Sequence, residues 1–277
     1  MFKLATLTAA LTLAGCASLT SGPPTLEEAW VTDGFAAPES VALSEDGSFL
    51  YVSNVSGEGA EKDGDGFISK ITLDGELIER RWAEGLNGPK GLALSEDGLL
   101  WISDIDQLVA VDATTGALQQ SHEIAEAVFL NYAAVLPDGT VLVADSGGAK
   151  IYGFDGKTVS IWLEDDTLQS INGLLPRGDD LLVTTMDGLL LTVDIATKAP
   201  TVLASDLGQG DGVAVTRGGF LVSHWPGRIM HVSNDGEATV LLDTEAEGTF
   251  QNDLILLGNT VIVPNWQPGT VTAWTIR

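Results

Sequence analysis

One segment recurs six times along this chain and constrains its fold more than any other feature. Its first copy extends from Glu39 to Asn54 and contains a polar residue, an apolar run, a turn at 45–47 and a second apolar run. The six copies start, 39 to 51 residues apart, at Glu39, Lys90, Asn131, Asn172, Asp211 and Asn252. A recurring interval of this size is typical of a repeat architecture.

Within each repeat, short runs rich in Val, Ile and Leu alternate with turns that contain glycine, which is the pattern of β-strands. The strands expected in the first three repeats are 40–44, 49–53, 66–72, 76–83, 90–94, 99–103, 107–112, 117–123, 131–136, 140–144, 149–154 and 158–163. Similar sets follow at 172–204 and 211–242. The last repeat has strands only at 252–256, 260–264 and 269–276, and a strand-like segment at 27–33 precedes the first repeat.

These observations predict an all-β chain folded as a six-bladed β-propeller with four-stranded blades. The segment 27–33 would join the last blade as its outer strand and close the ring, so that no sheet edge stays unpaired between the first and last repeats. A linear β-solenoid is the competing architecture, but its repeats are usually shorter and it needs no strand exchange. The predicted propeller occupies residues 26–277 as one domain.

The composition limits the partners of this domain. Hydrophobic residues make up 44% of the sequence, which is enough for a large core, although the formal net charge is −26. Such an acidic surface repels nucleic acid and anionic lipid and attracts cations. We therefore expect no nucleic-acid partner.

Residues 1–15 have the features of an export signal, with Lys3 as the positive charge and an apolar segment too short to span a bilayer. The ending Leu-Ala-Gly-Cys at 13–16 resembles the lipobox of bacterial lipoproteins. The resemblance implies lipid on Cys16, a tether at 16–25 and a membrane anchor in the cell envelope, on the outer membrane facing the periplasm because Ala17 is no retention signal. An ordinary signal peptide that happens to contain a cysteine is the alternative.

An insertion at 57–66 makes the first interval longer than the others. Its run Asp63-Gly64-Asp65-Gly66 invites a calcium-loop interpretation. However, Ile68 and Asp74 stand where that loop requires Gly and Glu. We expect a solvated hairpin loop.

Polar residues stand at both ends of the first strand pair in every repeat. In a blade, the start of the first strand and the end of the second lie on the same face, near the central channel. The starting residues are the six that open the copies, and the ending residues are Asn54, Asp104, Asp145, Thr185, His224 and Asn265. Converging side-chain oxygens suit a hard divalent cation such as Ca²⁺. For Asn252, Asp104 and Asp145, a simple role in turns, through side-chain-to-backbone hydrogen bonds, is the favoured alternative.

The repeat pattern, Glu39, the Asn172-Gly173 step and the Asp211-Gly212 step together resemble the SMP-30/gluconolactonase family, and more distantly NHL-repeat and paraoxonase-like propellers. The resemblance implies Ca²⁺ or another divalent cation held by Glu39, Asn172 and Asp211 over the channel. It implies that Asn131 contacts substrate and water at the ion. The family commonly has Asp and Gly after this Asn, and this chain departs from that pattern.

The same resemblance implies hydrolysis of lactones or esters. The cation would polarise the carbonyl, and Asp211, or water at the ion, would act as base or nucleophile. His224 could be a general base near neutral pH, although a lone histidine often only packs or donates hydrogen bonds. Trp225 and Trp266 could form walls of the substrate pocket.

Lys90 is the one cationic residue of the expected ring. It could neutralise Glu39 or Asp211 in the absence of metal, bind an acidic group of the substrate, or lie along the mouth with its amine in water. Two other functions stay open, because propellers are also common non-catalytic platforms. The protein could be a scaffold that recruits another envelope protein, or a small-ligand-binding lipoprotein in which any metal is structural.

Overall fold

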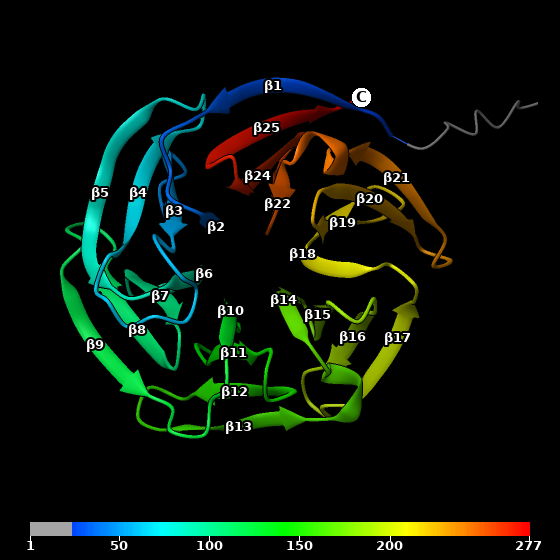
Figure 1. Ribbon diagram of the computed structural model, residues 1–277. Helices are drawn as coiled ribbons and strands as arrows, with labels where there is room; N and C mark the ends of the chain where they lie inside the picture. Colours follow the sequence, from blue (N-terminus) through cyan, green and yellow to red (C-terminus); the bar gives the residue numbers. More distant parts are fainter. Residues whose placement is uncertain (1–23) are drawn as a thin grey trace, which may run out of the picture.

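The computed structural model describes residues 24–277, and in it six β-sheets are arranged around a central channel. Figure 1 looks along the channel, with the first strand of each sheet near the centre and the last strand on the rim. All strand pairs are antiparallel, and within blades 1 to 5 each strand pairs with the next one along the chain. The predicted six-bladed propeller with four strands per blade is confirmed. Residues 1–23, including Cys16 and the expected signal peptide, lie outside the described residues.

The strands follow the repeats closely. Blade 1 consists of β2 (Pro38–Leu43), β3 (Phe49–Asn54), β4 (Gly66–Thr72) and β5 (Leu77–Leu86). Blade 2 consists of β6 (Pro89–Leu94), β7 (Leu99–Asp104), β8 (Gln107–Asp112) and β9 (Leu118–Glu123). Blade 3 consists of β10 (Leu130–Val135), β11 (Val141–Asp145), β12 (Lys150–Phe154) and β13 (Val159–Glu164).

The second half of the ring is built in the same way. Blade 4 consists of β14 (Ile171–Arg177), β15 (Asp180–Thr185), β16 (Leu190–Asp194) and β17 (Pro200–Ala204). Blade 5 consists of β18 (Gln209–Thr216), β19 (Gly219–Trp225), β20 (Arg228–Ser233) and β21 (Ala238–Asp243). Blade 6 consists of β22 (Phe250–Gln251), β23 (Ile255–Leu257), β24 (Thr260–Gln267), β25 (Thr270–Ile276) and β1 (Leu26–Thr32).

The N-terminal strand closes the ring as the sequence predicts. β1 runs antiparallel to β25, with Leu26 opposite Ile276 and Thr32 opposite Val271. In Figure 1 it lies along the outside of β25 and leads directly into blade 1. Two distant parts of the chain therefore share one sheet, and the edge of β25 is covered.

Two local features differ from the expected strands. The inner strand of blade 6 is interrupted at Asn252–Leu254, so the strand expected at 252–256 is reduced to β22 and β23 on either side of the break. Short 3₁₀ turns stand at Asp166–Leu168 and Glu245–Glu247. Within residues 24–277, no helix has the length and apolar character needed to cross a membrane.

The hydrophobic core lies between neighbouring blades. One buried cluster joins Tyr51 and Ile68 of blade 1 to Leu100 and Ile102 of blade 2, and similar clusters join the other pairs. Four tryptophans pack against these clusters, namely Trp30, Trp82, Trp162 and Trp274. This packing fixes the blades relative to one another and so fixes the side chains that face the channel.

Candidate functional site at the channel mouth

A β-bulge at the start of each of the first five inner strands places a polar residue at the channel mouth. In blade 1, Pro38 pairs with Asn54 and Val41 pairs with Val52, so two residues of β2 stand opposite Ser53 alone. The other four bulged pairs are Lys90-Gly91, Asn131-Tyr132, Asn172-Gly173 and Asp211-Gly212. Bulges commonly re-aim side chains in this way near functional sites.

Hydroxyl groups of the second strand hold several of these bulges. Ser53 Oγ accepts a 2.8 Å hydrogen bond from the Ser40 amide, and Ser223 Oγ accepts one of 2.8 Å from the Gly212 amide. Thr184 Oγ1 accepts from the Gly173 amide at 3.0 Å. Thr184 also donates to the Asp211 carbonyl of the next blade, so the same hydroxyl joins two blades at the mouth.

The polar residues predicted for the ring are all buried where the inner strands begin. The exposed fractions are 5% for Glu39, 3% for Lys90, 6% for Asn131, 1% for Asn172, 4% for Asp211 and 3% for Asn252. Four oxygens on these side chains have no hydrogen-bond partner among residues 24–277, namely Glu39 Oε2, Asn131 Oδ1, Asn172 Oδ1 and Asp211 Oδ1. Unpartnered buried oxygens are costly, so their concentration here indicates a ligand.

Electrostatic repulsion adds to this cost. Burial raises the pKa of Glu39 well above its usual range, and repulsion from Asp211 and Asp253 raises it further, while Lys90 lowers it. Burial also raises the pKa of Asp211, followed by repulsion from Asp253, and the Asn172 hydrogen bond opposes this shift. A cation would relieve both desolvation and repulsion by favouring the charged carboxylates.

Asp253 belongs to the same group of carboxylates, but aligning the six repeats did not identify it. It follows Asn252 in the interrupted inner strand of blade 6 and is fully buried. Its Oδ1 accepts from Tyr132 Oη at 2.9 Å and from the Leu254 amide at 2.7 Å, and its Oδ2 accepts from Ser40 Oγ at 2.7 Å. Its only signal in the sequence is a carboxylate at the second position of a repeat, next to the polar residue that opens the copy.

Asp104 and Asp145 accept hydrogen bonds from loop amides, the role in turns that was the favoured alternative, whereas Asn252 links two blades. Asn252 donates to the Pro38 carbonyl at 2.9 Å and so links blade 6 to blade 1. Asp104 accepts from the Asn87 and Gly88 amides, and Asp145 accepts from the Val128 and Phe129 amides. Each carboxylate holds the loop that leads into its own inner strand.

Lys90 fixes the insertion at 57–66 to the mouth. Its amine donates to the Gly59 carbonyl at 2.9 Å and to the Gly88 carbonyl at 3.1 Å, and it lies 4.4 Å from the centre of the Phe129 ring. Burial lowers its pKa, whereas Glu39 and Asp104 raise it. The amine is therefore out of water, but it forms no ion pair with the carboxylates within 4.0 Å in the described part of the chain.

The aromatic residues predicted to line the substrate pocket lie together on blades 5 and 6. Trp225 and Trp266 meet edge to face with ring centres 6.2 Å apart, and Phe250 lies 5.1 Å from Trp225. The α-carbon of Gly59 lies beside Trp266, because a Cβ there would be 3.8 Å from its ring. The insertion thus extends from Trp266 on blade 6 to Lys90 on blade 2.

His224 has a different environment from the ring carboxylates. It pairs with Gly210 at the end of β19, is 7% exposed, and its Nδ1 lies 3.7 Å from Glu245 Oε1. Burial lowers its pKa, as does the nearby Arg228, while Glu245 and Asp243 raise it. Its charged neighbours are therefore those of the blade 5 rim, and its catalytic role stays a prediction.

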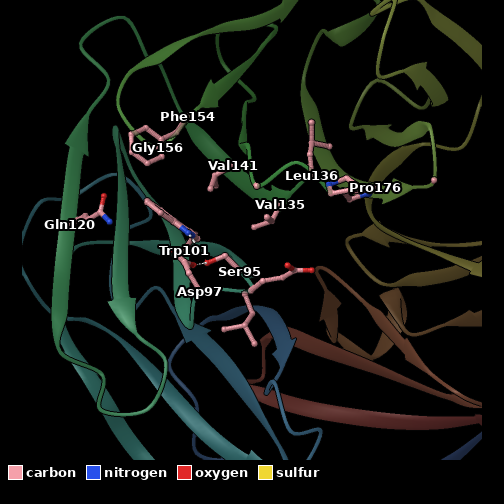
Figure 2. A pocket seen from close by; sticks show the side chains of 15 residues that line it. Ser95, Asp97, Trp101, Gln120, Val135, Leu136, Val141, Phe154, Gly156 and Pro176 are labelled. Carbon is pink, nitrogen blue, oxygen red and sulfur yellow. Dashed lines mark hydrogen bonds between the residues drawn. The ribbon is translucent and has the colours of Figure 1, made fainter.

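A cavity of about 660 Å³ lies at the other end of the inner strands (Figure 2). It is lined by the turns that follow β6 and β10 and by Trp101 and Phe154, which Figure 2 shows on its wall. Because Lys90 and Asn131 are at the opposite ends of these two strands, the cavity is separate from the polar ring.

The polar ring offers a set of oxygens that could hold a hard cation. Among residues 24–277, no group of three or more His, Cys, Asp or Glu side chains is close enough to hold a metal. The unpartnered oxygens instead come from two carboxylates, Glu39 and Asp211, and two carboxamides, Asn131 and Asn172. Mixed carboxylate and amide oxygens are the ligands of Ca²⁺.

Comparisons with known proteins support the fold. No protein-family model and no curated protein sequence matches the chain. A catalytically inactive variant of virginiamycin B lyase from Staphylococcus aureus, solved with quinupristin, has a TM-score of 0.65 at 12% identity and covers 91% of this chain and 99% of that chain. A streptogramin B lyase has a TM-score of 0.63 at 12% identity, covering 92% and 98%.

A structure named as a "putative gluconolactonase" has a TM-score of 0.65 at 18% identity and covers 92% of both chains. All these identities are below 25%, so the similarity shows the six-bladed propeller fold alone. The solved structures of this fold thus include proteins of both the gluconolactonase and the lyase type.

Proposed function

We propose that this protein is a divalent-cation-dependent hydrolase of lactones or esters, with its active site at the channel mouth. The observation that carries the proposal is the set of four buried, unpartnered oxygens on Glu39, Asn131, Asn172 and Asp211. Ca²⁺ is the cation that this oxygen set fits best. The gluconolactonase name of one structural neighbour supports the reaction class at the level of the fold only.

The bound cation would supply charge stabilisation for a polarised carbonyl oxygen. Around it, Glu39 and Asp211 provide negative charge, and the hydrogen bond from Asn172 orients the Asp211 carboxylate so that its Oδ1 faces the site. Asp211 is then the group positioned to accept a proton from attacking water. His224 is the second candidate base, because its lowered pKa leaves it neutral near pH 7.

The remaining residues of the mouth would bind the substrate. Trp225 and Trp266 offer an apolar wall, and Asn131 offers an amide within the ring. Lys90 and the insertion at 57–66 cover the side between blades 6 and 2 and limit the access of water. A hydrolase needs this exclusion of bulk water, so that only positioned water reacts.

The test is hydrolysis of a panel of lactones and aryl esters with Ca²⁺ and with EDTA. We expect activity that requires the cation and falls by at least about 100-fold in Asp211→Asn, in line with the loss of a catalytic acid–base group. Asp235→Asn, which changes an exposed carboxylate in a distant turn, is the control. Unchanged hydrolysis in Asp211→Asn contradicts the assignment of Asp211.

The second candidate function is that of a small-ligand-binding or scaffold protein. Cation binding without hydrolysis of any member of the panel favours it. The insertion that covers the mouth also suits this function.

Location is a separate part of the proposal. The lipobox-like ending at Cys16 supports a lipid-anchored protein of the bacterial cell envelope, on the outer membrane and facing the periplasm. Cys16→Ser should release the protein from the membrane fraction, whereas Ser18→Ala should not. Membrane association of Cys16→Ser would contradict lipid anchoring.

A further inference from the structure

The residue that follows the polar residue opening each repeat divides the six blades into two kinds. Three blades have glycine there, at Gly91, Gly173 and Gly212, and a Cβ at any of them would collide with the backbone of the next inner strand. The other three have Ser40, Tyr132 and Asp253, the last within the interrupted inner strand of blade 6. Ser40 and Tyr132 both donate side-chain hydrogen bonds to Asp253.

The contact between Tyr132 and Asp253 crosses the channel. Tyr132 is on β10 of blade 3, and Asp253 is between β22 and β23 of blade 6. In a closed ring of six blades these two are opposite, as Figure 1 shows for β10 and β22. A single phenol ring therefore spans the channel, and its hydroxyl reaches Asp253 Oδ1 at 2.9 Å.

The Asp253 carboxylate is fully engaged, in contrast to the ring oxygens. Ser40, Tyr132 and the Leu254 amide together use both of its oxygens. Among the described residues, Glu39 Oε2 and Asp211 Oδ1 have no partner. Asp253 thus brings negative charge to the site with both of its oxygens already hydrogen-bonded.

We propose that Tyr132 is the floor of the mouth site: its ring closes the channel beneath the ring of polar residues, and its hydroxyl holds the Asp253 carboxylate below the candidate cation. The floor makes the mouth a pocket with one entrance. Tyr132 and Asp253 are positioning residues in this scheme, since they act on the ion and on water through the ring. The second half of the proposal rests on the proposed cation site, whereas the closure of the channel does not.

The closure is tested on the metal-free protein by hydrogen exchange of peptides covering 38–44 and 249–258. Tyr132→Ala should speed exchange in both segments by about threefold or more, because solvent then enters from both ends of the channel. Tyr132→Phe keeps the ring, so it should leave this exchange near the wild-type rate. Its thermal midpoint should nevertheless fall by about 2–4 °C, because the buried Asp253 carboxylate loses a hydrogen bond.

Tyr152→Phe is the matched control. Tyr152 is a buried tyrosine of the same blade, but its hydroxyl has no hydrogen-bond partner among the described residues. Its exchange should not change, and its midpoint should stay the same or rise, because a buried hydroxyl without a partner is removed. Equal exchange in wild type and in a folded Tyr132→Ala overturns the closure, and a midpoint of Tyr132→Phe equal to that of Tyr152→Phe overturns the role of the hydroxyl. If Tyr132→Ala does not fold, Tyr132→Leu, which also lacks the ring, takes its place in the exchange comparison.

The effect on the ion is tested with Tb³⁺ as the probe. The luminescence decay of bound Tb³⁺ in H₂O and D₂O reports the number of water molecules on the ion, which an entirely structural role of Tyr132 would not alter. We expect more bound water in Tyr132→Ala than in wild type, and binding about tenfold weaker in Asp253→Asn because a nearby buried charge is removed. Unchanged water number and affinity overturn this half of the proposal. Failure of wild type to bind Tb³⁺ would instead contradict the cation site, and the exchange result would stand independently.

Discussion

Asn172 donates a 3.1 Å hydrogen bond from Nδ2 to Asp211 Oδ2, and within residues 24–277 neither Asn172 Oδ1 nor Asp211 Oδ1 has a hydrogen-bond partner. The two residues belong to adjacent blades and are 1% and 4% exposed. The hydrogen bond fixes both side chains in one orientation, so that Asn172 Oδ1 and Asp211 Oδ1 remain available for a ligand. A pair prepared in this way costs stability until the ligand binds, and several predictions about the cation depend on that cost.

Ca²⁺ should stabilise the wild-type protein against heat. At a free concentration of about 100 times Kd, a ligand that binds only the folded state adds about 2.7 kcal/mol, or roughly 5–10 °C for a chain of this size. Thermal melts in Ca²⁺ and in EDTA measure the shift. Glu39→Gln and Asp211→Asn should abolish most of it, and Asp235→Asn should retain it. A full shift in either ring variant would mean that Ca²⁺ binds elsewhere.

Stability of the metal-free protein should decrease as the pH rises, because of the buried carboxylates. The folded-state pKa values of Glu39 and Asp211 are raised, chiefly by burial, and burial raises that of Asp253 to about 6. The folded state therefore binds more protons than the unfolded state, so this contribution is complete below about pH 4 and is lost as the pH rises through the folded values. For Asp253 the window is about pH 4 to 6, and the difference of about two pKa units corresponds to about 3 kcal/mol at most.

Chemical unfolding at a series of pH values in EDTA checks this sign. Glu39→Gln removes one buried charge, so its stability relative to wild type should increase with pH. Ca²⁺ should reverse the wild-type trend, because the ion binds the charged carboxylates and its stabilisation grows as they ionise. The stability curves of wild type in Ca²⁺ and in EDTA should then separate as the pH rises. Parallel curves would contradict the binding of an ion to these carboxylates. His224, whose pKa is lowered, contributes the opposite slope in acid, but it is common to both proteins and cancels in the comparison.

The contrast between the ring and its floor shows what the sequence could and could not predict. Repeats place equivalent residues at equivalent positions, so aligning six copies was sufficient to find Glu39, Asn172 and Asp211 at one face of one ring. The Tyr132–Asp253 contact follows no repeat, because it joins two residues 121 positions apart through the reach of one side chain across the channel. Only the closed ring brings them together.

The interrupted strand of blade 6 was unpredictable for a related reason. The apolar pattern after Asn252 suggested a continuous strand, but Asp253 turns toward Ser40 and Tyr132 and takes its hydrogen bonds there. Side-chain partners from other blades thus replace part of the strand pairing. A local pattern reports strand propensity and carries no information on such partners.

Gly212→Ala should destabilise the fold at the mouth. Its backbone has no positive φ that alanine would resist, but the added Cβ would collide with the Leu254 amide and stand 2.6 Å from Asp253 Oδ1. We expect a loss of about 1–3 kcal/mol, as for other overpacked sites. Denaturant unfolding measures it, with Gly59→Ala as the control because a Cβ there meets only the Trp266 ring at 3.8 Å. Equal stability of the two variants would show that the inner strands separate more easily than the contact suggests.

Lys90→Met should strengthen cation binding while loosening the insertion. The Lys90 amine lowers the pKa of Glu39, so its positive charge acts on the same site that the cation would occupy. Removing a charge at this range is worth about 1–2 kcal/mol, and we expect a Kd for Ca²⁺ about five- to thirtyfold lower by isothermal titration calorimetry. The amine also donates to the Gly59 carbonyl, so the segment 57–66 should become more sensitive to limited proteolysis.

Lys62→Met separates the two effects. Lys62 is on the same insertion and pairs with Asp106, but its environment includes no ring carboxylate, and its side chain is 53% exposed. The Lys62→Met substitution should make the insertion more sensitive to proteolysis without altering the Kd for Ca²⁺. If Lys90→Met instead weakens Ca²⁺ binding, the charge prediction is wrong. Lys90 would then help Ca²⁺ binding by holding the ring residues in place, and this effect would exceed the repulsion between its amine and the ion. If both variants leave the insertion resistant, the Lys90 hydrogen bond to Gly59 does not hold it.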